Sequence, residues 1–407
     1  MAGRHQSRGS TPQAGSDPAL HPPGTAGANG GQAGWAVTSA HISWARTPAP
    51  RSLSRWLGAL LSLLVLVCTA MAAPARAALP PGNAVTDPAA LLRNALPIQQ
   101  PDLQELQHRL EATSDDLRAK RWSALSTNVR RAQSLLSSRR SALEAAFPAD
   151  QKDRVQQLLD TLNTQLQALT ESTDNKDRDA FLNDRRQALT TIGEAEAILV
   201  GPFPFTIPSD FDALPRLLGR ATVRLTTTKG DLITVVDGYN APLTAGAFVD
   251  LAQRGFYDDL PFNRAEDFYV LQTGDPKGAA DGYVDPKSGA VRRVPLEIRV
   301  PGQEEPYYNL TFEDLGLFKA EPTLPFNAKG TLGWAHSDQA LDDGSSQFFL
   351  FLFEPELTPA GLNLIDGRYA AFGYVVDGFD VLEELTADDG IIKATVIEGA
   401  ELLRPHA

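Results

Sequence analysis

The sequence predicts a multidomain chain in two folded parts: an antiparallel helical bundle, then a closed antiparallel β-barrel with flanking helices. Leucines recur at helical spacing through residues 78–200, and short β-rich runs separated by turn residues fill residues 220–407. Residues 78–200 carry 15 basic and 17 acidic side chains, a net of −2, whereas residues 201–407 carry 16 and 32, a net of −16. This change of charge near residue 200 indicates a boundary between the two parts.

The composition excludes several classes of protein. The chain has 407 residues, a hydrophobic share of 43% and a charged share of 21%, which is typical of a soluble globular chain with two or three domains. The formal net charge of −13 argues against a nucleic-acid binder with a broad basic face. The single cysteine, Cys68, excludes a disulfide framework and a thiolate metal cluster.

The N-terminal segments have the pattern of targeting sequences. Residues 1–50 are rich in Gly, Ala, Ser and Pro and lack an apolar period, so we expect a disordered preface or a transit segment. Residues 51–77 follow the order of a secretory signal peptide, with Arg51 and Arg55, an apolar run, and Ala75-Arg76-Ala77 before a cut. A transmembrane anchor is the alternative, because about 17 apolar residues is near the lower limit for spanning a bilayer. Cleavage would export a mature chain without Cys68.

Apolar stripes predict the helices of the bundle, residues 78–200. A first stripe runs through residues 103–143 and ends before Pro148, a second covers residues 155–169, and a third covers residues 181–199. Asp150 is expected to cap the second helix. Such stripes usually form only a core, although a binding groove on the bundle remains an alternative.

A proline-rich strap, residues 201–219, follows the bundle. Its four prolines disfavour helix, and we expect its interleaved phenylalanines to pack along the seam between the two parts. Beyond it, Lys229-Gly230 predicts a hairpin, and a helix is expected after Pro242. A closed barrel suits the later β-leaning runs, because closure leaves no unpaired strand edge.

Three separated blocks resemble the cyclophilin peptidyl-prolyl isomerases. The first includes Phe262-Asn263-Arg264, Gln272 and Gly274-Asp275-Pro276; the second is Ser346-Gln347-Phe348-Phe349; the third runs from Leu364-Ile365-Asp366-Gly367 to Phe372-Gly373. The resemblance implies a barrel of cyclophilin type over residues 220–407. The whole architecture is similar to the large thylakoid-lumen cyclophilins of cyanobacteria and chloroplasts, a group associated with photosystem II assembly and maintenance. It therefore implies an exported protein of the thylakoid lumen, with the periplasm as the alternative.

The chemistry of this family needs neither metal nor cofactor, and we expect none. Rotation about an X–Pro bond faces a barrier of ~18–20 kcal/mol because of amide resonance, and it requires no nucleophile. A guanidinium near the prolyl nitrogen favours the twisted amide, while an apolar cup holds the ring and a side-chain amide holds a neighbouring carbonyl. The resemblance assigns catalytic roles to Arg264 and Gln272. It assigns substrate binding to Tyr269, Val270, Ala335, His336, Phe349, Leu364, Ile365 and Tyr369.

Several residues depart from the family pattern. Asn263 stands where a histidine is usual, Asp267-Phe268 replaces the usual Pro-Gly, and Leu364 replaces a tryptophan that many members carry. A carboxylate from Glu266 or Asp267 paired with Arg264 would compete with its use on a substrate. We therefore hypothesise weak isomerase activity, with binding better preserved than turnover.

An acidic insertion, residues 276–329, is longer than a compact cyclophilin needs. It is either a partner-docking or groove-covering arm or a solvated insertion, and the sequence favours neither.

The leading prediction is an isomerase that acts as a folding or assembly factor. Its partners would be proline-containing polypeptide clients, such as lumenal segments of membrane proteins, with no nucleic acid and at most peripheral membrane contact. The alternatives are a non-catalytic scaffold or chaperone that binds extended client segments, and a regulatory module for a membrane phosphatase or protease.

Overall fold

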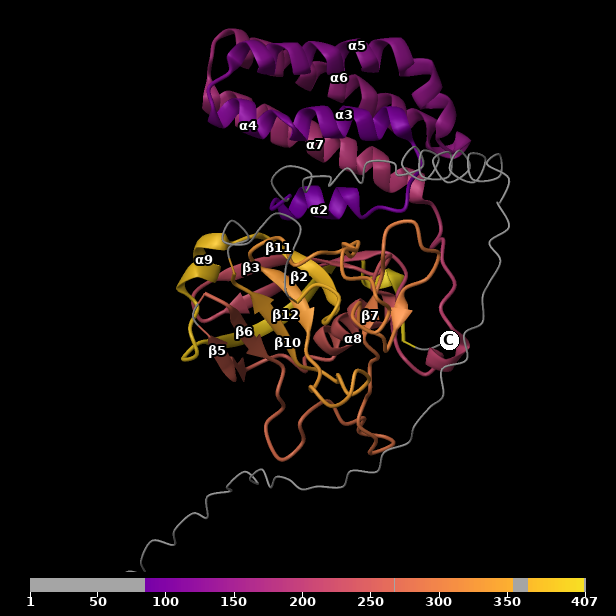
Figure 1. Ribbon diagram of the computed structural model, residues 1–407, viewed down its shortest axis with the longest axis vertical. Helices are drawn as coiled ribbons and strands as arrows, with labels where there is room; N and C mark the ends of the chain where they lie inside the picture. The colour runs from indigo at the N-terminus through magenta and orange to yellow at the C-terminus, as the bar shows by residue number, and fades with distance from the viewer. Residues whose placement is uncertain (1–84, 267, 354–364, 406–407) are drawn as a thin grey trace, which may run out of the picture. The chain divides into compact units, whose positions relative to one another are not determined.

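The computed structural model describes residues 85–266, 268–353 and 365–405 (Figure 1). The predicted preface and signal peptide, residues 1–50 and 51–77, lie outside the described residues, and so does Leu364. Within the described ranges, none of the helices combines the length and the hydropathy needed to cross a bilayer.

Five helices of the N-terminal part share a leucine-rich core formed by the residues of the three predicted stripes, and the first stripe is divided among the first three of these helices. The five helices are α3 (Pro101–Glu111), α4 (Thr113–Arg118), α5 (Trp122–Ala146), α6 (Lys152–Asp174) and α7 (Arg178–Val200). The predicted cap at Asp150 is wrong, because a 3₁₀ turn over Ala149–Gln151 precedes α6 and no side chain caps that helix. Asp177 instead caps α7, where its carboxylate accepts hydrogen bonds from the backbone N–H groups of Asp179 and Ala180.

A short first helix, α2 (Pro88–Asn94), packs with the sheet rather than with that leucine core. Leu91, Leu92 and Ala95 are buried in the same core cluster as the strands. The amide of Asn240 donates to the carbonyl of Ala95 at 2.8 Å, and Arg220 donates to the carbonyl of Leu92. These donors satisfy carbonyls that the end of a helix leaves without partners.

The C-terminal part is built on one antiparallel sheet of nine strands in the order β4-β12-β2-β3-β11-β9-β10-β6-β5. The strands are β2 (Arg220–Thr227), β3 (Asp231–Asp237), β4 (Leu260–Pro261), β5 (Arg264–Glu266), β6 (Val270–Thr273), β9 (Thr331–Trp334), β10 (Phe348–Phe351), β11 (Ala371–Asp377) and β12 (Gly390–Glu398). Two small pairs accompany it, β1 (Arg216–Leu217) with β13 (Leu403–Arg404) and β7 (Glu297–Ile298) with β8 (Tyr307–Tyr308). Helices α8 (Pro242–Gln253) and α9 (Phe379–Glu384) complete this part.

The predicted closed barrel is wrong, because the sheet is curled but open. Its two edge strands, β4 and β5, are successive pieces of one segment, and no ladder joins them in the described residues. Between them, the N–H of Phe262 donates to Asp389 at 3.0 Å, next to β12, and the N–H of Asn263 donates to Gln272 in β6 at 3.0 Å. Because these bonds do not form a ladder between the two edge strands, the sheet in the described residues is a half-barrel.

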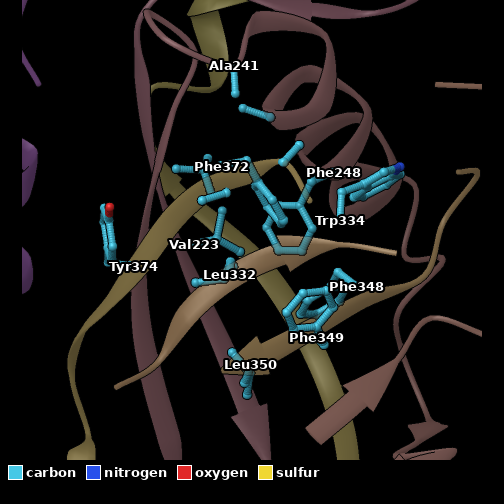
Figure 2. Close-up of a cluster of buried hydrophobic side chains, with 14 of the residues drawn as sticks. Val223, Ala241, Phe248, Leu332, Trp334, Phe348, Phe349, Leu350, Phe372 and Tyr374 are labelled. Atoms are coloured by element: carbon cyan, nitrogen blue, oxygen red, sulfur yellow. The ribbon is translucent and has the colours of Figure 1, made fainter. Parts of the chain in front are cut away.

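Aromatic side chains from α8 and from the strands β9, β10 and β11 fill the core of the sheet (Figure 2). The ring of Phe248, from α8, lies 5.1 Å from that of Phe348 and 5.3 Å from that of Phe372. Trp334 contacts Phe372 edge-on at 5.8 Å. Such edge-on aromatic pairs are favourable beyond the area that they bury.

The acidic insertion is part of this core, so a wholly solvated insertion is wrong. Its side chains Val294, Leu296, Ile298, Phe312 and Leu324 are all buried. The buried carboxylate of Glu297 accepts hydrogen bonds at 3.1 Å from the first backbone N–H groups of α8, those of Leu243 and Thr244. The insertion therefore contributes apolar packing and the cap of α8.

The proline-rich strap also has defined contacts. Phe203 stacks on Tyr239 at 6.4 Å, and the guanidinium of Arg299 lies 3.4 Å from the ring centre of Phe205. Phe211 contacts Tyr308 at 4.7 Å. Its aromatic residues thus pack on residues of the C-terminal part.

Candidate functional site

A cavity that is partly open to solvent lies at the strands β5, β6 and β10 and at the residues that follow β9; its empty volume, open solvent included, is about 550 Å³. It is lined by Arg264, Tyr269, Val270, Gln272, Ala335, His336, Phe349, Ile365 and Tyr369. The structure thus brings together nine of the ten site residues that the sequence predicts. The tenth, Leu364, lies outside the described residues. The insertion contributes none of these nine lining residues.

Strand register explains why the cavity has a cation, an amide and an aromatic ring in one row. Arg264 of β5 pairs with Gln272 of β6, and Gln272 pairs with Phe349 of β10. Directly paired residues of antiparallel strands have their side chains on the same face. Phe349 in turn pairs with Gly333 of β9, where an added Cβ would lie 2.2 Å from the Phe349 ring. Glycine at that position leaves room for the ring.

The floor of the cavity is apolar and buried. Val270, Phe349 and Ile365 are each at most 7% exposed. Phe326 of the insertion stacks behind Phe349 at 5.8 Å with nearly parallel rings, and Tyr369 contacts Phe349 edge-on at 5.6 Å. Sequence reasoning did not identify Phe326 as a support for the floor.

A chain of amides holds Gln272. Its Nε2 donates to the Oε1 of Gln347 at 2.8 Å, and Asn263 donates to the same oxygen at 3.2 Å. Gln347 in turn donates to the carbonyl of Asp281 at 3.0 Å. These bonds fix the orientation of the Gln272 amide. Sequence reasoning did not single out Gln347, but its position two residues before Phe349 in an extended chain places both on one face.

His336 and Tyr369 form one wall. The imidazole stacks on the Tyr369 ring at 4.7 Å. Its Nδ1 lies 2.8 Å from the carbonyl of Ser337 and its Nε2 lies 2.9 Å from the carbonyl of Arg368. Burial raises the pKa of the Tyr369 hydroxyl above its ordinary value, so this wall carries no phenolate. The contacts of the imidazole fix its orientation.

The guanidinium of Arg264 lies at the mouth of the cavity and pairs with Glu266. Its Nε donates to Oε1 of Glu266 at 2.9 Å, and Nη2 donates to the same oxygen. The two side chains are 53% and 48% exposed, so the pair is a weak surface interaction. The second predicted competitor, Asp267, lies outside the described residues.

A partly buried carboxyl group, Asp366, supports the floor. It accepts a hydrogen bond at 2.8 Å from the backbone N–H of Phe326 and follows Ile365 directly. Burial raises its pKa to about 7, and the nearby charge of Glu321 adds to the rise. Sequence reasoning assigned Asp366 no role, although it stands within the third block of resemblance.

This arrangement can hold an apolar ring against Phe349 with a cation and an amide beside it. In the described ranges, no group of three or more His, Cys, Asp or Glu side chains could hold a metal ion. The geometry therefore offers shape and electrostatics for a bound amide, the two means by which bond rotation can be accelerated.

Comparisons with known proteins relate both parts of the chain to isomerases. The family described as cyclophilin type peptidyl-prolyl cis-trans isomerase/CLD matches residues 222–401. A second family, described as the PsbQ-like domain of CYP38-like peptidyl-prolyl cis-trans isomerases, matches residues 87–200.

The relatives that match most of the chain include the following two. A Synechocystis sp. protein named as a thylakoid lumen peptidyl-prolyl cis-trans isomerase is 51% identical over 326 residues, which cover 80% of this chain and 86% of the relative. The chloroplastic isomerase CYP38 of Arabidopsis thaliana is 40% identical over 333 residues, which cover 79% of this chain and 76% of the relative. A solved cyclophilin-type isomerase of Cryptosporidium parvum has 22% identity and a TM-score of 0.31, and covers 44% of this chain and 99% of its own.

Proposed function

Because the chain belongs to the cyclophilin-type peptidyl-prolyl cis-trans isomerases, we propose that the cavity beside Arg264 is where it isomerises X–Pro bonds of polypeptide clients. The observation that carries the proposal is the row of Arg264, Gln272 and Phe349 across three neighbouring strands. This row places a cation, an amide and an apolar surface within one cavity of about 550 Å³.

Each member of the row has a role in rotation. The proline ring rests on Phe349, in the cup completed by Val270 and Ile365. Arg264 donates toward the prolyl nitrogen, which becomes a better acceptor as the amide twists out of conjugation. The Gln272 amide, held by Gln347, binds a neighbouring carbonyl. These interactions strengthen in the twisted state, so they lower the barrier without covalent chemistry or proton transfer.

The clients that we propose are exported segments of photosynthetic membrane complexes. The two relatives carry thylakoid-lumen and chloroplast names, which supports a lumenal location for this chain. The finer role, in assembly or maintenance of photosystem II, rests on the similarity of the whole architecture to the large thylakoid-lumen cyclophilins.

Exchange spectroscopy by NMR tests the proposal. Peptides copied from lumenal loops of photosystem II subunits are mixed with the full mature chain, and cis/trans exchange of their X–Pro bonds is measured. We expect exchange faster than the uncatalysed tens to hundreds of seconds. Peptide signals that broaden while exchange stays at the uncatalysed rate would contradict the proposal and favour a binding scaffold. A standard Ala-Pro peptide run in parallel separates loss of isomerase activity from a wrong choice of client.

A further inference from the structure

The turn between β5 and β6 carries a phenylalanine where the backbone favours glycine. The N–H of Tyr269 donates to the carbonyl of Glu266 at 3.0 Å and closes a four-residue turn. Phe268, the third residue of that turn, has a φ of 60°. This left-handed conformation suits glycine or asparagine and is strained for a bulky side chain. The phenylalanine therefore does not stabilise the turn.

The ring of Phe268 adds nothing to the core either. The residue is 83% exposed, more than any other large hydrophobic side chain in the described ranges. A fold gains little from an aromatic ring left in water. Strained residues that persist without a structural benefit are concentrated at binding and catalytic sites.

Phe268 does not line the cavity itself, but it lies in the turn that leads into it. The next residue, Tyr269, lines the cavity, and the two strands that the turn joins contribute Arg264, Val270 and Gln272 to it. The ring is thus exposed at the tip of the hairpin on which the proposed catalytic arginine stands.

We infer that Phe268 contacts an apolar side chain of the client close to its proline, and so selects clients with a bulky apolar residue there. This specificity rests on the proposed function of the same cavity. A membrane surface fits the ring less well, because the two acidic residues Glu266 and Asp267 outnumber Arg264 in this segment and leave it a net negative charge.

Three variants test the inference. Phe268→Asn removes the ring and tolerates the left-handed backbone, whereas Phe268→Tyr keeps an aromatic ring. Phe318→Asn is the matched control, because Phe318 is also highly exposed, at 70%, but lies in the insertion, which contributes no lining residue, whereas Phe268 directly precedes the lining residue Tyr269. The substrates are Ala-rich peptides with one proline, in which phenylalanine replaces alanine at one of the four nearest positions at a time.

The readout is the preference for phenylalanine over alanine, measured in kcat/KM and in binding constants. We expect a preference in the wild type at one or more positions, and we expect F268N to reduce it by about two- to tenfold, the range for one aromatic contact. The loss should fall on KM and not on kcat. F268Y should keep the preference and F318N should not alter it. The melting temperature of F268N should equal or exceed that of the wild type.

Three results would overturn the inference: a preference unchanged in F268N, a preference lost equally in F318N, or a lower melting temperature in F268N that accounts for weaker binding. Binding of the wild type and of F268N to vesicles of neutral and of anionic lipid is measured as well. Vesicle binding that depends on Phe268 while peptide preference does not would assign the ring to a membrane and contradict the inference. The binding constants decide about Phe268 even if the wild type does not accelerate exchange, a result that would count against the proposed function alone.

Discussion

The ion pair between Arg264 and Glu266 determines how freely the guanidinium can act on a bound amide. Glu266→Gln removes the charge and keeps the length of the side chain. Because the two side chains are 53% and 48% exposed, the pair is worth at most about 1 kcal/mol, which corresponds to about fivefold in a rate constant. We therefore expect kcat/KM of E266Q for an X–Pro peptide to rise by about two- to fivefold above that of the wild type. Glu266 would then weakly inhibit catalysis in the wild type.

The assay is peptide exchange at low and at high ionic strength. Salt screens an exposed ion pair, so the difference between E266Q and the wild type should shrink as salt is added. Glu384→Gln is the control, because Glu384 is an exposed carboxylate of α9 that does not line the cavity. A fall in kcat/KM for E266Q would refute the reasoning, because it would show that the carboxylate positions the guanidinium for catalysis.

Three further predictions concern the supports of the site and of the sheet. The folded chain keeps the proton of Asp366 up to about pH 7, against an ordinary pKa of 3.8, so Asp366 should lower stability by up to about 4 kcal/mol as pH rises from 4 to 7. Urea unfolding across this range should show a flatter profile in D366N, and an unchanged slope would contradict the shift. Gln347→Leu frees the Gln272 amide and should lower kcat about fivefold, the value of one hydrogen bond, without lowering the melting temperature; unchanged exchange would contradict that support. Arg220→Ala leaves the fully buried Asp237 without its cation and should cost about 3–5 kcal/mol of unfolding free energy, partly restored in R220A/D237N; a loss under about 1 kcal/mol would contradict it.

Local patterns predicted the elements better than the way they assemble. The stripe that includes Leu125, Val129 and Leu136 predicted a buried helical face, and those residues are buried in α5. Barrel closure failed as a prediction because it depends on how the chain bends between β4 and β5, whose hydrogen bonds run to two different strands. The sequence also does not predict which core α2 packs against, because Leu91 and Leu92 make a small apolar surface that fits either core.

In the candidate site, too, local sequence predicted the individual residues better than the contacts that support them. Its lining followed from residues in three recognisable blocks, and the pairing of Arg264 with Glu266 followed from their spacing of two on one strand. The supports of the site join distant positions: Gln272 with Gln347 across 75 residues, and Phe326 with Asp366 across 40. No local pattern encodes such contacts, because they arise only when the strands and the insertion have packed.

The most direct test of the account is the effect of Arg264→Ala on cis/trans exchange in a single-proline peptide, with peptide binding measured on the same samples. The account predicts that exchange falls close to the uncatalysed rate while binding weakens only a few-fold, because the apolar cup around Phe349 remains. Arg264→Lys should recover little, since an ammonium lacks the planar fork of donors. Exchange that stays as fast as in the wild type, with R264A folded and the peptide bound, would contradict the account.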